Sequence, residues 1–362
     1  MTYLLWALPA LAVIAAIASG RLDTIKAAVL GLSIAVPVAM FTGPAAFGGV
    51  QLVHALARGL WIGATIAPYI LGGLLFWQIA AHGAAAPAGA NVAGLQATGA
   101  SRIARRRLLF FACFLVGPFA ESATGFGVGM LGTVTLIRRL DIAPRPLMIF
   151  ALLSQTMIPW GAMGSGTMLA AAFAHLPGSE LGLYSMVPVS LLMLVWLALF
   201  WRTAREAGLG ASARECAHEA LWIAAGLALL APATAWLGPE SALLATYGPL
   251  IVLRYLMDVR PDRRAAWATA RRAWPYIMLI AVLVATRLLP ALKHELQALW
   301  KIAPFSDLPA WSPFFHAGSW LVAGGVLTAL ARGQPYELAS ERRSPINTGR
   351  ATIMAVFIFA MM

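Results

Sequence analysis

The apolar stretch 108–137 carries a single acidic or basic side chain, Glu121, within the segment GPFAESATGFGVGM. A carboxyl group at membrane depth is costly unless it is paired, protonated or hydrated, so it marks a candidate functional group. Glu121 is therefore the candidate proton-coupling residue. Hydroxyls and glycine-rich backbone beside it could donate to a small carboxylate. The candidate substrate-binding residues of this stretch are Ser122, Ala123, Thr124, Gly125, Phe126, Gly127 and Gly129.

A second break is expected in the segment SQTMIPWGAMGSGT, residues 154–167, inside a span that begins near Leu147. Non-helical backbone at membrane depth is tolerated only where protein buries it or water reaches it. Two such breaks close in sequence are typical of secondary transporters, in which half-helix N-termini face anionic substrates. The candidate substrate-binding residues of this break are Gln155, Pro159, Trp160, Gly161 and Gly164.

Each of these features also has a purely structural explanation. Glu121 could be a paired residue that holds the bundle together, and small residues suit tight helix packing. Pro159 and Gly161 could form a packing kink. Arg287 lies near a span end, where we expect its head group to extend to the interface. The Arg-rich stretch 254–272 is expected to be a solvated inside surface.

The composition predicts an all-α polytopic membrane protein. Of its 362 residues 60% are hydrophobic and 11% are charged, and the mean hydropathy is +0.79. Soluble domains carry about 25% charged residues. Apolar runs of spanning length recur, which predicts about 10–11 membrane segments. The net charge of +12 lies in short loops, so it indicates membrane orientation and no nucleic-acid partner.

The positions of the basic residues favour a re-entrant hairpin at 108–137. A straight helix over this stretch would be about 45 Å long, against a hydrocarbon core of roughly 30 Å. With a hairpin and an outside N-terminus, all but four of the 26 Lys and Arg residues fall in inside loops or inside span ends. A single crossing would invert every later loop and remove this bias. We therefore expect two short helices joined by an unwound tip that holds Glu121, Ser122 and Thr124.

The chain is expected to form a single membrane domain built from two repeats. The last apolar segment starts near Thr352 and stops at Met362, which is too short to cross a bilayer, so the second repeat is expected to be incomplete. The expected division is a membrane domain over 1–362, a first repeat over 1–202 with a hairpin at 108–137 and a broken span at 147–173, and a second repeat over 219–362.

The two breaks resemble the L-lactate permease family. GPFAESATGFGVGM is similar to the family motif FLEGAAGFG(T/A)P, and SQTMIPWGAMG is similar to NTAPVAFGAMG; a weaker likeness covers RAWPYIML, residues 272–279. The residues that match the family are Glu121, Ala123, Gly125, Phe126, Gly127, Gly161, Ala162, Met163 and Gly164. The departures are Ser122, Thr124, Gly129, Gln155 and Pro159.

The resemblance implies a multi-pass protein of the bacterial inner membrane that takes up lactate, glycolate or similar 2-hydroxy monocarboxylates by proton symport. It also implies the fold of ion transporters with two inverted repeats, each carrying a hairpin and a broken helix. Members of the family are longer, so the chain is expected to be truncated at its C-terminus.

Other functions stay open at this point. The substrate could be another organic anion, such as a dicarboxylate or a sulfonate, or the chain could be an inactive fragment or a partner subunit of a split transporter. An enzyme would need a nucleophile–base pair or metal ligands, and no suitably spaced cluster occurs in the spans, so we expect no enzymatic activity and no cofactor or metal. The expected partners are a small organic anion, a proton and membrane lipid. The sequence leaves a homo-oligomer open.

Overall fold

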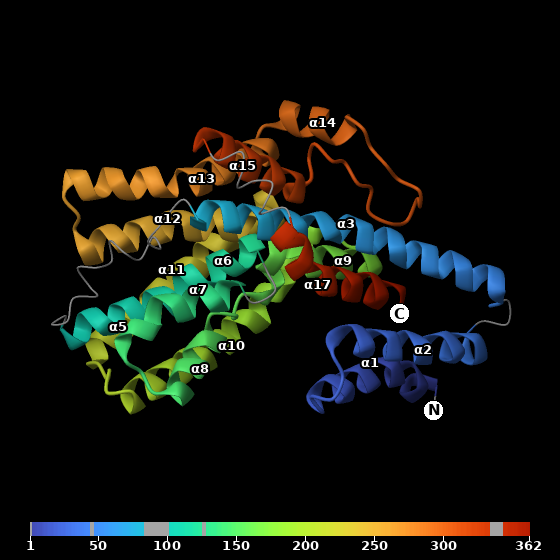
Figure 1. Ribbon diagram of the computed structural model, residues 1–362, viewed down its shortest axis with the longest axis horizontal. Coiled ribbons are helices and arrows are strands. Elements are labelled where there is room, and N and C mark those ends of the chain that lie inside the picture. The colour runs from blue at the N-terminus through green and yellow to red at the C-terminus, as the bar shows by residue number, and fades with distance from the viewer. Residues whose placement is uncertain (1, 44–46, 83–100, 125–127, 334–342) are drawn as a thin grey trace.

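The computed structural model describes residues 2–43, 47–82, 101–124, 128–333 and 343–362. This part of the chain is helical apart from the connections between helices, the longest of which contains an isolated antiparallel bridge between Ile302 and Trp311 (Figure 1). The helices are α1 (Thr2–Ala18), α2 (Thr24–Thr42), α3 (Gly49–His82), α5 (Arg102–Phe111), η2 (Ala112–Val116), α6 (Gly117–Thr124), α7 (Val128–Ile137), η3 (Arg138–Leu140), α8 (Pro144–Leu153), η4 (Ile158–Gly164), α9 (Ser165–Ala174), α10 (Gly178–Glu206), α11 (Ala213–Leu237), α12 (Pro239–Val259), α13 (Arg263–Leu288), α14 (Pro290–Ala298), α15 (Ala317–Ala331) and α17 (Arg343–Met361).

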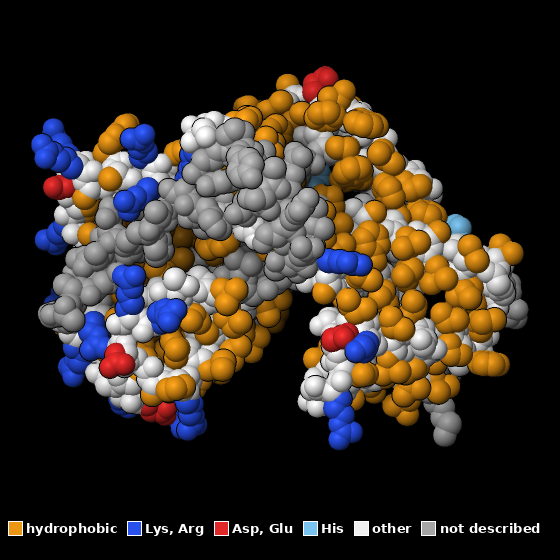
Figure 2. Space-filling model, in the orientation of Figure 1, with side chains coloured by type: hydrophobic (Ala, Val, Ile, Leu, Met, Phe, Trp, Pro, Cys, Tyr) orange, Lys and Arg blue, Asp and Glu red, His pale blue; other side chains and the backbone are white. Residues whose placement is uncertain are grey.

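The expected class of all-α polytopic membrane protein is confirmed. By length and composition, six helices of the described chain could cross a membrane: α2, α3, α10, α11, α12 and α13. Five shorter apolar helices accompany them: Tyr3–Ala18, Pro144–Leu153, Ser165–Ala174, Ala317–Ala331 and Gly349–Met361. Many large apolar side chains are exposed on these helices, as lipid-facing side chains are, and Figure 2 shows them spread over the surface.

The stretch from α5 to α7 forms the hairpin that the sequence predicts. One arm runs through α5, η2 and α6, and α7 returns alongside it. The Thr133 hydroxyl on α7 donates to the Ala112 carbonyl oxygen at 3.2 Å. Where the two arms begin and end, opposite the tip, the Arg105 guanidinium donates to the Leu140 carbonyl oxygen. The chain therefore enters and leaves the hairpin at the same end of the bundle.

The expected unwound tip is shorter than the sequence suggests. Glu121, Ser122 and Thr124 all lie within α6, so the prediction that places them in non-helical backbone is wrong. The physical reason lies one turn earlier, in the π-helical segment η2, where the Gly117 amide donates to the Ala112 carbonyl. The wider turn accommodates Pro118, which has no amide hydrogen to donate, and the helix continues beyond it.

The predicted break after Leu147 is confirmed. Helix α8 ends at Leu153, the chain continues as the 3-10 segment η4, and α9 follows. Met163 (φ 55°) and Gly164 (φ 66°) both have left-handed backbone at the end of η4. Such a conformation is strained for methionine and is found where the surrounding structure enforces it. Here it sets the direction in which α9 leaves the break.

Basic side chains gather at one end of the molecule. In Figure 2 most of the visible Lys and Arg side chains lie at the left, where Figure 1 places the beginnings of α5 and α13 and the end of α12. The α14–α15 connection, residues 299–316, lies away from this end. A clear separation of this kind is what the positive-inside rule predicts for a membrane protein. The division into two repeats stays a prediction.

Candidate functional site

Glu121 lies between the two breaks. Its Oε2 accepts a hydrogen bond from the Gly129 amide at 3.1 Å, so the carboxylate lies at the beginning of α7. A methyl group added at Gly129 would come within 2.8 Å of the Glu121 backbone nitrogen, which shows how closely α7 approaches α6 here. Only a glycine at position 129 allows this approach.

Gln155 completes this contact from the other break. Oriented by its neighbours, its amide nitrogen donates to both Glu121 oxygens, at 3.1 and 3.2 Å, and its amide oxygen accepts from the Met130 amide at 3.2 Å. The first residues after α8 are thereby joined to the hairpin. Three residues that the sequence places in one site, Glu121, Gly129 and Gln155, do lie together.

The beginning of α7 already holds a carboxylate in this conformation. Amides in the first turn of a helix have no partner within the helix, and the positive end of the helix dipole favours an anion there. Glu121 takes the Gly129 amide, and Gln155 takes the Met130 amide. The donors that could bind a substrate carboxylate are therefore occupied by the protein's own acceptors.

Ser122 and Trp160 fix the hairpin against the break. The Ser122 hydroxyl donates to the Trp160 carbonyl oxygen at 2.9 Å, so its proton is not directed at an anion. Trp160 is fully buried, and its indole nitrogen donates to the Thr234 hydroxyl on α11 at 2.9 Å. The carbonyl of Pro159 accepts from the Thr167 hydroxyl at 2.6 Å. These three candidate residues hold the irregular backbone in place.

The remaining candidates are placed as follows. Ala123 is buried in an apolar cluster together with Met163 of η4 and Leu244 of α12. Gly161 faces open space, since a methyl group added there would have no neighbour within 4 Å. Gly125, Phe126 and Gly127 lie outside the described residues, as does the side chain of Thr124.

Gly164 brings the break against the beginning of α12. A methyl group added at Gly164 would lie 2.9 Å from the Pro239 carbonyl carbon and 3.1 Å from the Glu240 nitrogen. Its left-handed backbone would also be strained with a side chain. The end of η4 is thus in direct contact with a carboxylate-bearing residue that the sequence analysis does not single out.

Glu240 belongs to a polar cluster formed by three helices and the residue that caps a fourth. The Tyr69 hydroxyl on α3 donates to Glu240 Oε1, and Arg287 Nη2 on α13 donates to Glu240 Oε2 at 3.1 Å. The Tyr69 and His316 rings pack against each other at an interplanar angle of 46°, with a centroid distance of 4.1 Å. We refer to Tyr69, Glu240, Arg287 and His316 as the α12 entry cluster.

The interfacial placement expected for Arg287 is wrong. Its side chain is only 3% exposed, and Nη1 donates to the Thr286 hydroxyl at 2.8 Å. The position of Arg287 near a span end suggests that its side chain extends to the interface. Instead the guanidinium lies in the protein interior, where it forms an ion pair with Glu240. A sequence signal existed: Glu240 is an acidic residue that directly follows Gly238 and Pro239 at a helix start.

His316 caps α15 as the neutral tautomer with its proton on Nε2. Nδ1 accepts from the Gly318 amide at 3.2 Å, and Nε2 donates to the Thr65 carbonyl at 3.0 Å. Both ring nitrogens are therefore used by backbone groups. The charges of the α12 entry cluster are those of Glu240 and Arg287, which balance each other.

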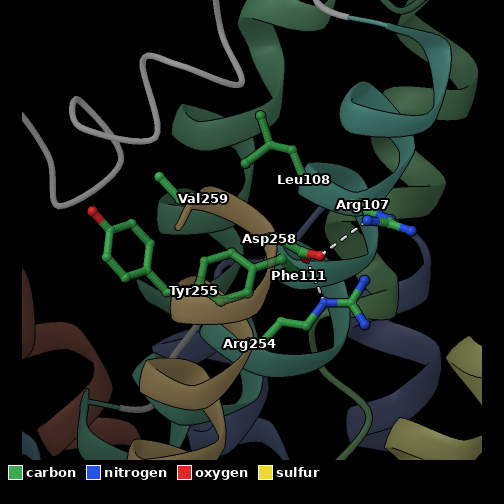
Figure 3. A pocket seen from close by; sticks show the side chains of 7 residues that line it. All are labelled: Arg107, Leu108, Phe111, Arg254, Tyr255, Asp258 and Val259. Carbon is green, nitrogen blue, oxygen red and sulfur yellow. Dashed lines mark hydrogen bonds and ion pairs between the residues drawn. The ribbon is translucent and has the colours of Figure 1, made fainter. Parts of the chain in front are cut away.

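A second charged cluster lies at the basic end of the bundle. Arg106 and Glu219, each 1% exposed, pair at 2.7 Å, which joins α5 to α11. Figure 3 shows Asp258 between Arg107 and Arg254 beside a small pocket, with distances of 3.4 and 2.6 Å. The expectation that the stretch from Arg254 onward is a solvated surface is wrong at its beginning, because Arg254 is buried under aromatic rings.

The two clusters differ in what they can do. At the basic end, the ion pairs connect α5, α11 and α12 at the base of the hairpin, so they stabilise it. The α12 entry cluster instead touches the break through Gly164. Between this cluster and Glu121 lie the buried apolar side chains of Ala123, Met163 and Leu244.

The chain was also compared with known proteins. Protein-family models, curated proteins and solved structures give no match to it. The functional conclusion therefore depends on the chemistry of the residues themselves.

Proposed function

We propose that this chain is a secondary transporter of lactate- or glycolate-type 2-hydroxy monocarboxylates, driven by proton symport across the bacterial inner membrane. The observation that carries the proposal is the Glu121 carboxylate at the beginning of α7, bonded to the Gly129 amide and to Gln155. The Gly129 and Gln155 amides donate to a carboxylate in this structure. A substrate carboxylate has the same chemistry.

Coupling follows from exchange between two carboxylates. When Glu121 takes up a proton, it no longer competes as an anion for the Gly129 amide and the Gln155 amide. The substrate carboxylate then takes these donors, and the site gains one negative and one positive charge together. Adding the anion without the proton would leave an uncompensated charge in a low-dielectric environment, which is costly.

Two residues of the break support a substrate of this class. Gly161 faces open space, and the Thr156 hydroxyl is buried without a hydrogen-bond partner within the part of the chain that the structure describes. Buried hydroxyls usually have partners. A 2-hydroxy group needs one donor or acceptor in addition to the carboxylate donors, and Thr156 supports a substrate of this class.

The proposal is tested with purified protein in liposomes. Uptake of radiolabelled L-lactate and of glycolate is measured with and without an imposed inward proton gradient. We expect accumulation that follows the gradient in the wild type and its loss in Glu121→Gln. The control is Glu206→Gln, which changes an exposed residue of α10; liposomes with this variant should accumulate lactate normally.

Two results would contradict the proposal. One is normal proton-coupled uptake by Glu121→Gln. The other is stronger inhibition of uptake by a dicarboxylate such as succinate, or by a sulfonate, than by lactate and glycolate, which would assign the same site to a different organic anion.

A further inference from the structure

We propose that Arg287 is an entry site for the substrate: a small monocarboxylate displaces Glu240 from Arg287, and the released Glu240 takes up one proton. This step rests on the proposed transport function and precedes binding at the beginning of α7. It assigns ligand binding to residues that lie outside the hairpin and the break.

The guanidinium of Arg287 has unused donor capacity. Glu240 contacts only Nη2, at 3.1 Å. Nε is buried and has no partner among the described residues. Arginine binds carboxylates best when Nε and Nη2 each donate to one oxygen. A free carboxylate can take both donors of this edge, whereas Glu240 takes one of them.

Glu240, which accepts from Arg287, also adjoins the break. Glu240 adjoins Gly164 at the end of η4, and Tyr69, Met163 and Ala123 belong to one buried apolar cluster. That cluster connects α3, the break and the hairpin. Arg287 is therefore connected to the irregular backbone of the break through Glu240.

Charge balance requires the proton. The groups that face Glu240 are Tyr69 from α3, Arg287 from α13 and His316 before α15; η4 contributes backbone only. With neutral Tyr69 and His316, the Glu240–Arg287 pair has no net charge. A monocarboxylate adds one negative charge, and one proton taken from water onto a Glu240 oxygen restores neutrality.

The proton balance also holds over the next step. When the anion moves on to the α7 amides, Glu240 returns to Arg287 and gives up its proton. Glu121 takes up one proton as its donors pass to the anion. One proton accompanies the anion at each of the two places.

The segment 299–316 covers one face of Arg287. The Phe315 ring covers the guanidinium face at 4.8 Å, and the Phe315 carbonyl accepts from Nη2 at 3.4 Å. Elsewhere this segment is held to α3, where Arg58 pairs with Asp307 and the Trp61 indole donates to the Pro309 carbonyl at 3.0 Å. Because the ring covers the face, an arriving carboxylate binds at the edge.

The test separates this step from coupling at Glu121 by working in the Glu121→Gln background. L-lactate is titrated into the purified protein by calorimetry in buffers of different ionisation enthalpy, which gives the protons taken up per lactate bound. We expect about one proton in Glu121→Gln and none in Glu121→Gln/Glu240→Gln. Glu121→Gln/Glu206→Gln is the matched control and should still take up the proton.

Arg287→Gln is combined with Glu240→Gln so that the Glu240 carboxylate is not left buried without its arginine. In the same background, Arg287→Gln/Glu240→Gln should bind L-lactate at least about tenfold more weakly than Glu240→Gln does. Size-exclusion profiles and thermal unfolding check that these variants are folded. Equal lactate affinity in the two variants, or unchanged proton uptake without Glu240, overturns the entry site.

These outcomes are distinguishable from failure of the proposed function. A wild type that neither binds nor accumulates L-lactate or glycolate overturns the transport proposal and the entry site with it. A wild type that accumulates lactate, while loss of Glu240 leaves proton uptake unchanged, overturns the entry site alone.

Discussion

Gly129 lies against the backbone of Glu121, so that the returning arm of the hairpin touches the arm that carries the carboxylate. A methyl group at position 129 would come within 2.8 Å of the Glu121 nitrogen. The same glycine donates its amide to the Glu121 side chain at 3.1 Å. Close approach and anion binding thus depend on one residue without a side chain.

Gly129→Val is therefore expected to separate the two arms. Overpacking of a close contact typically costs about 1–3 kcal/mol. We expect a lower free energy of unfolding, together with loss of lactate uptake, because the amide moves away from Glu121. Gly132→Ala on the same helix is the control, since its added methyl group would meet only the Trp77 ring at 3.7 Å. Equal stability and uptake in the two variants would contradict the contact.

Gln155 is expected to set the affinity for the anion. Gln155→Leu keeps the size of the side chain but removes the donors to Glu121 and the acceptor for the Met130 amide. We expect KM for L-lactate uptake to rise about tenfold, because a lost charge-assisted hydrogen bond is worth roughly 1.5–3 kcal/mol. Gln297→Leu on exposed α14 is the control. An unchanged KM would place Gln155 outside the binding site.

Breaking the buried Arg106–Glu219 pair is expected to be the most destabilising single change at the base of the hairpin. Glu219→Ala leaves the Arg106 guanidinium without its carboxylate, and breaking a buried pair costs about 3–5 kcal/mol. Glu206→Ala removes the exposed partner of Arg202 and should cost only about 0.3–0.5 kcal/mol. Unfolding in detergent compares the two.

An apolar replacement of both partners provides the decisive control for this pair. Arg106→Met/Glu219→Leu leaves no buried charge behind, although the Trp201 indole and the Leu209 carbonyl each lose a partner. We expect the double variant to recover most of the stability that Glu219→Ala loses. A double variant as unstable as Glu219→Ala would show that the side-chain packing, and not the unpaired charge, is responsible.

The hairpin and the break could be predicted from sequence because their signals are local. A lone Glu among glycines, a Pro and Gly run inside an apolar span, and basic residues on both sides of the hairpin each lie within a short segment. The exact extent of helix α6 could not be predicted. It depends on the π-helical turn of η2, which has no sequence signal of its own.

The α12 entry cluster could not be predicted in the same way. Glu240 and Arg287 belong to different helices, and their pairing follows from how α12 and α13 pack. In sequence, Arg287 resembles an interfacial residue near a span end. Arg106 likewise resembles one of several loop arginines, and only the fold shows that it is buried against Glu219. Buried pairs between distant residues leave no periodic pattern.

The ion pair between Arg58 and Asp307, which holds segment 299–316 to α3, is expected to weaken in acid. The Arg58 guanidinium donates to Asp307 and holds the pKa of that carboxyl below its ordinary value of 3.8. Because the pKa of Asp307 is lower in the folded protein, the ion pair stabilises the folded state fully above the pKa of the unfolded chain. This stabilisation is lost as the pH falls through the pKa of the folded state. Proteolysis of this segment should therefore increase as the pH falls below about 4.

Asp307→Asn is the control for this pH effect. The amide keeps the shape of the side chain but does not titrate, so proteolysis of 299–316 should be faster than in the wild type at neutral pH and should change little in acid. Cleavage is mapped by mass spectrometry with a protease that is active over the whole pH range. A wild-type cleavage rate that stays constant down to pH 3 would contradict the prediction that the Arg58–Asp307 pair protects this segment.

The same-side entry and exit of the hairpin is expected to appear in accessibility from the two faces of the membrane. Single cysteines are placed at Arg102 and Ala143, which are exposed before and after the hairpin, in a background without Cys113 and Cys216. An impermeant thiol reagent is applied to right-side-out and to inside-out vesicles. We expect both positions to react only in inside-out vesicles, because the basic loops lie inside.

A cysteine at Glu295 on exposed α14 supplies the opposite reference and should react only in right-side-out vesicles. With that reference, labelling of the cysteines at positions 102 and 143 from opposite faces would show that α5–α7 crosses the membrane once. The contact between Arg105 and the Leu140 carbonyl excludes this arrangement in the folded chain, since it joins the two ends of the hairpin. The labelling pattern thus tests, in a lipid bilayer, the geometry that holds Glu121 beside the break.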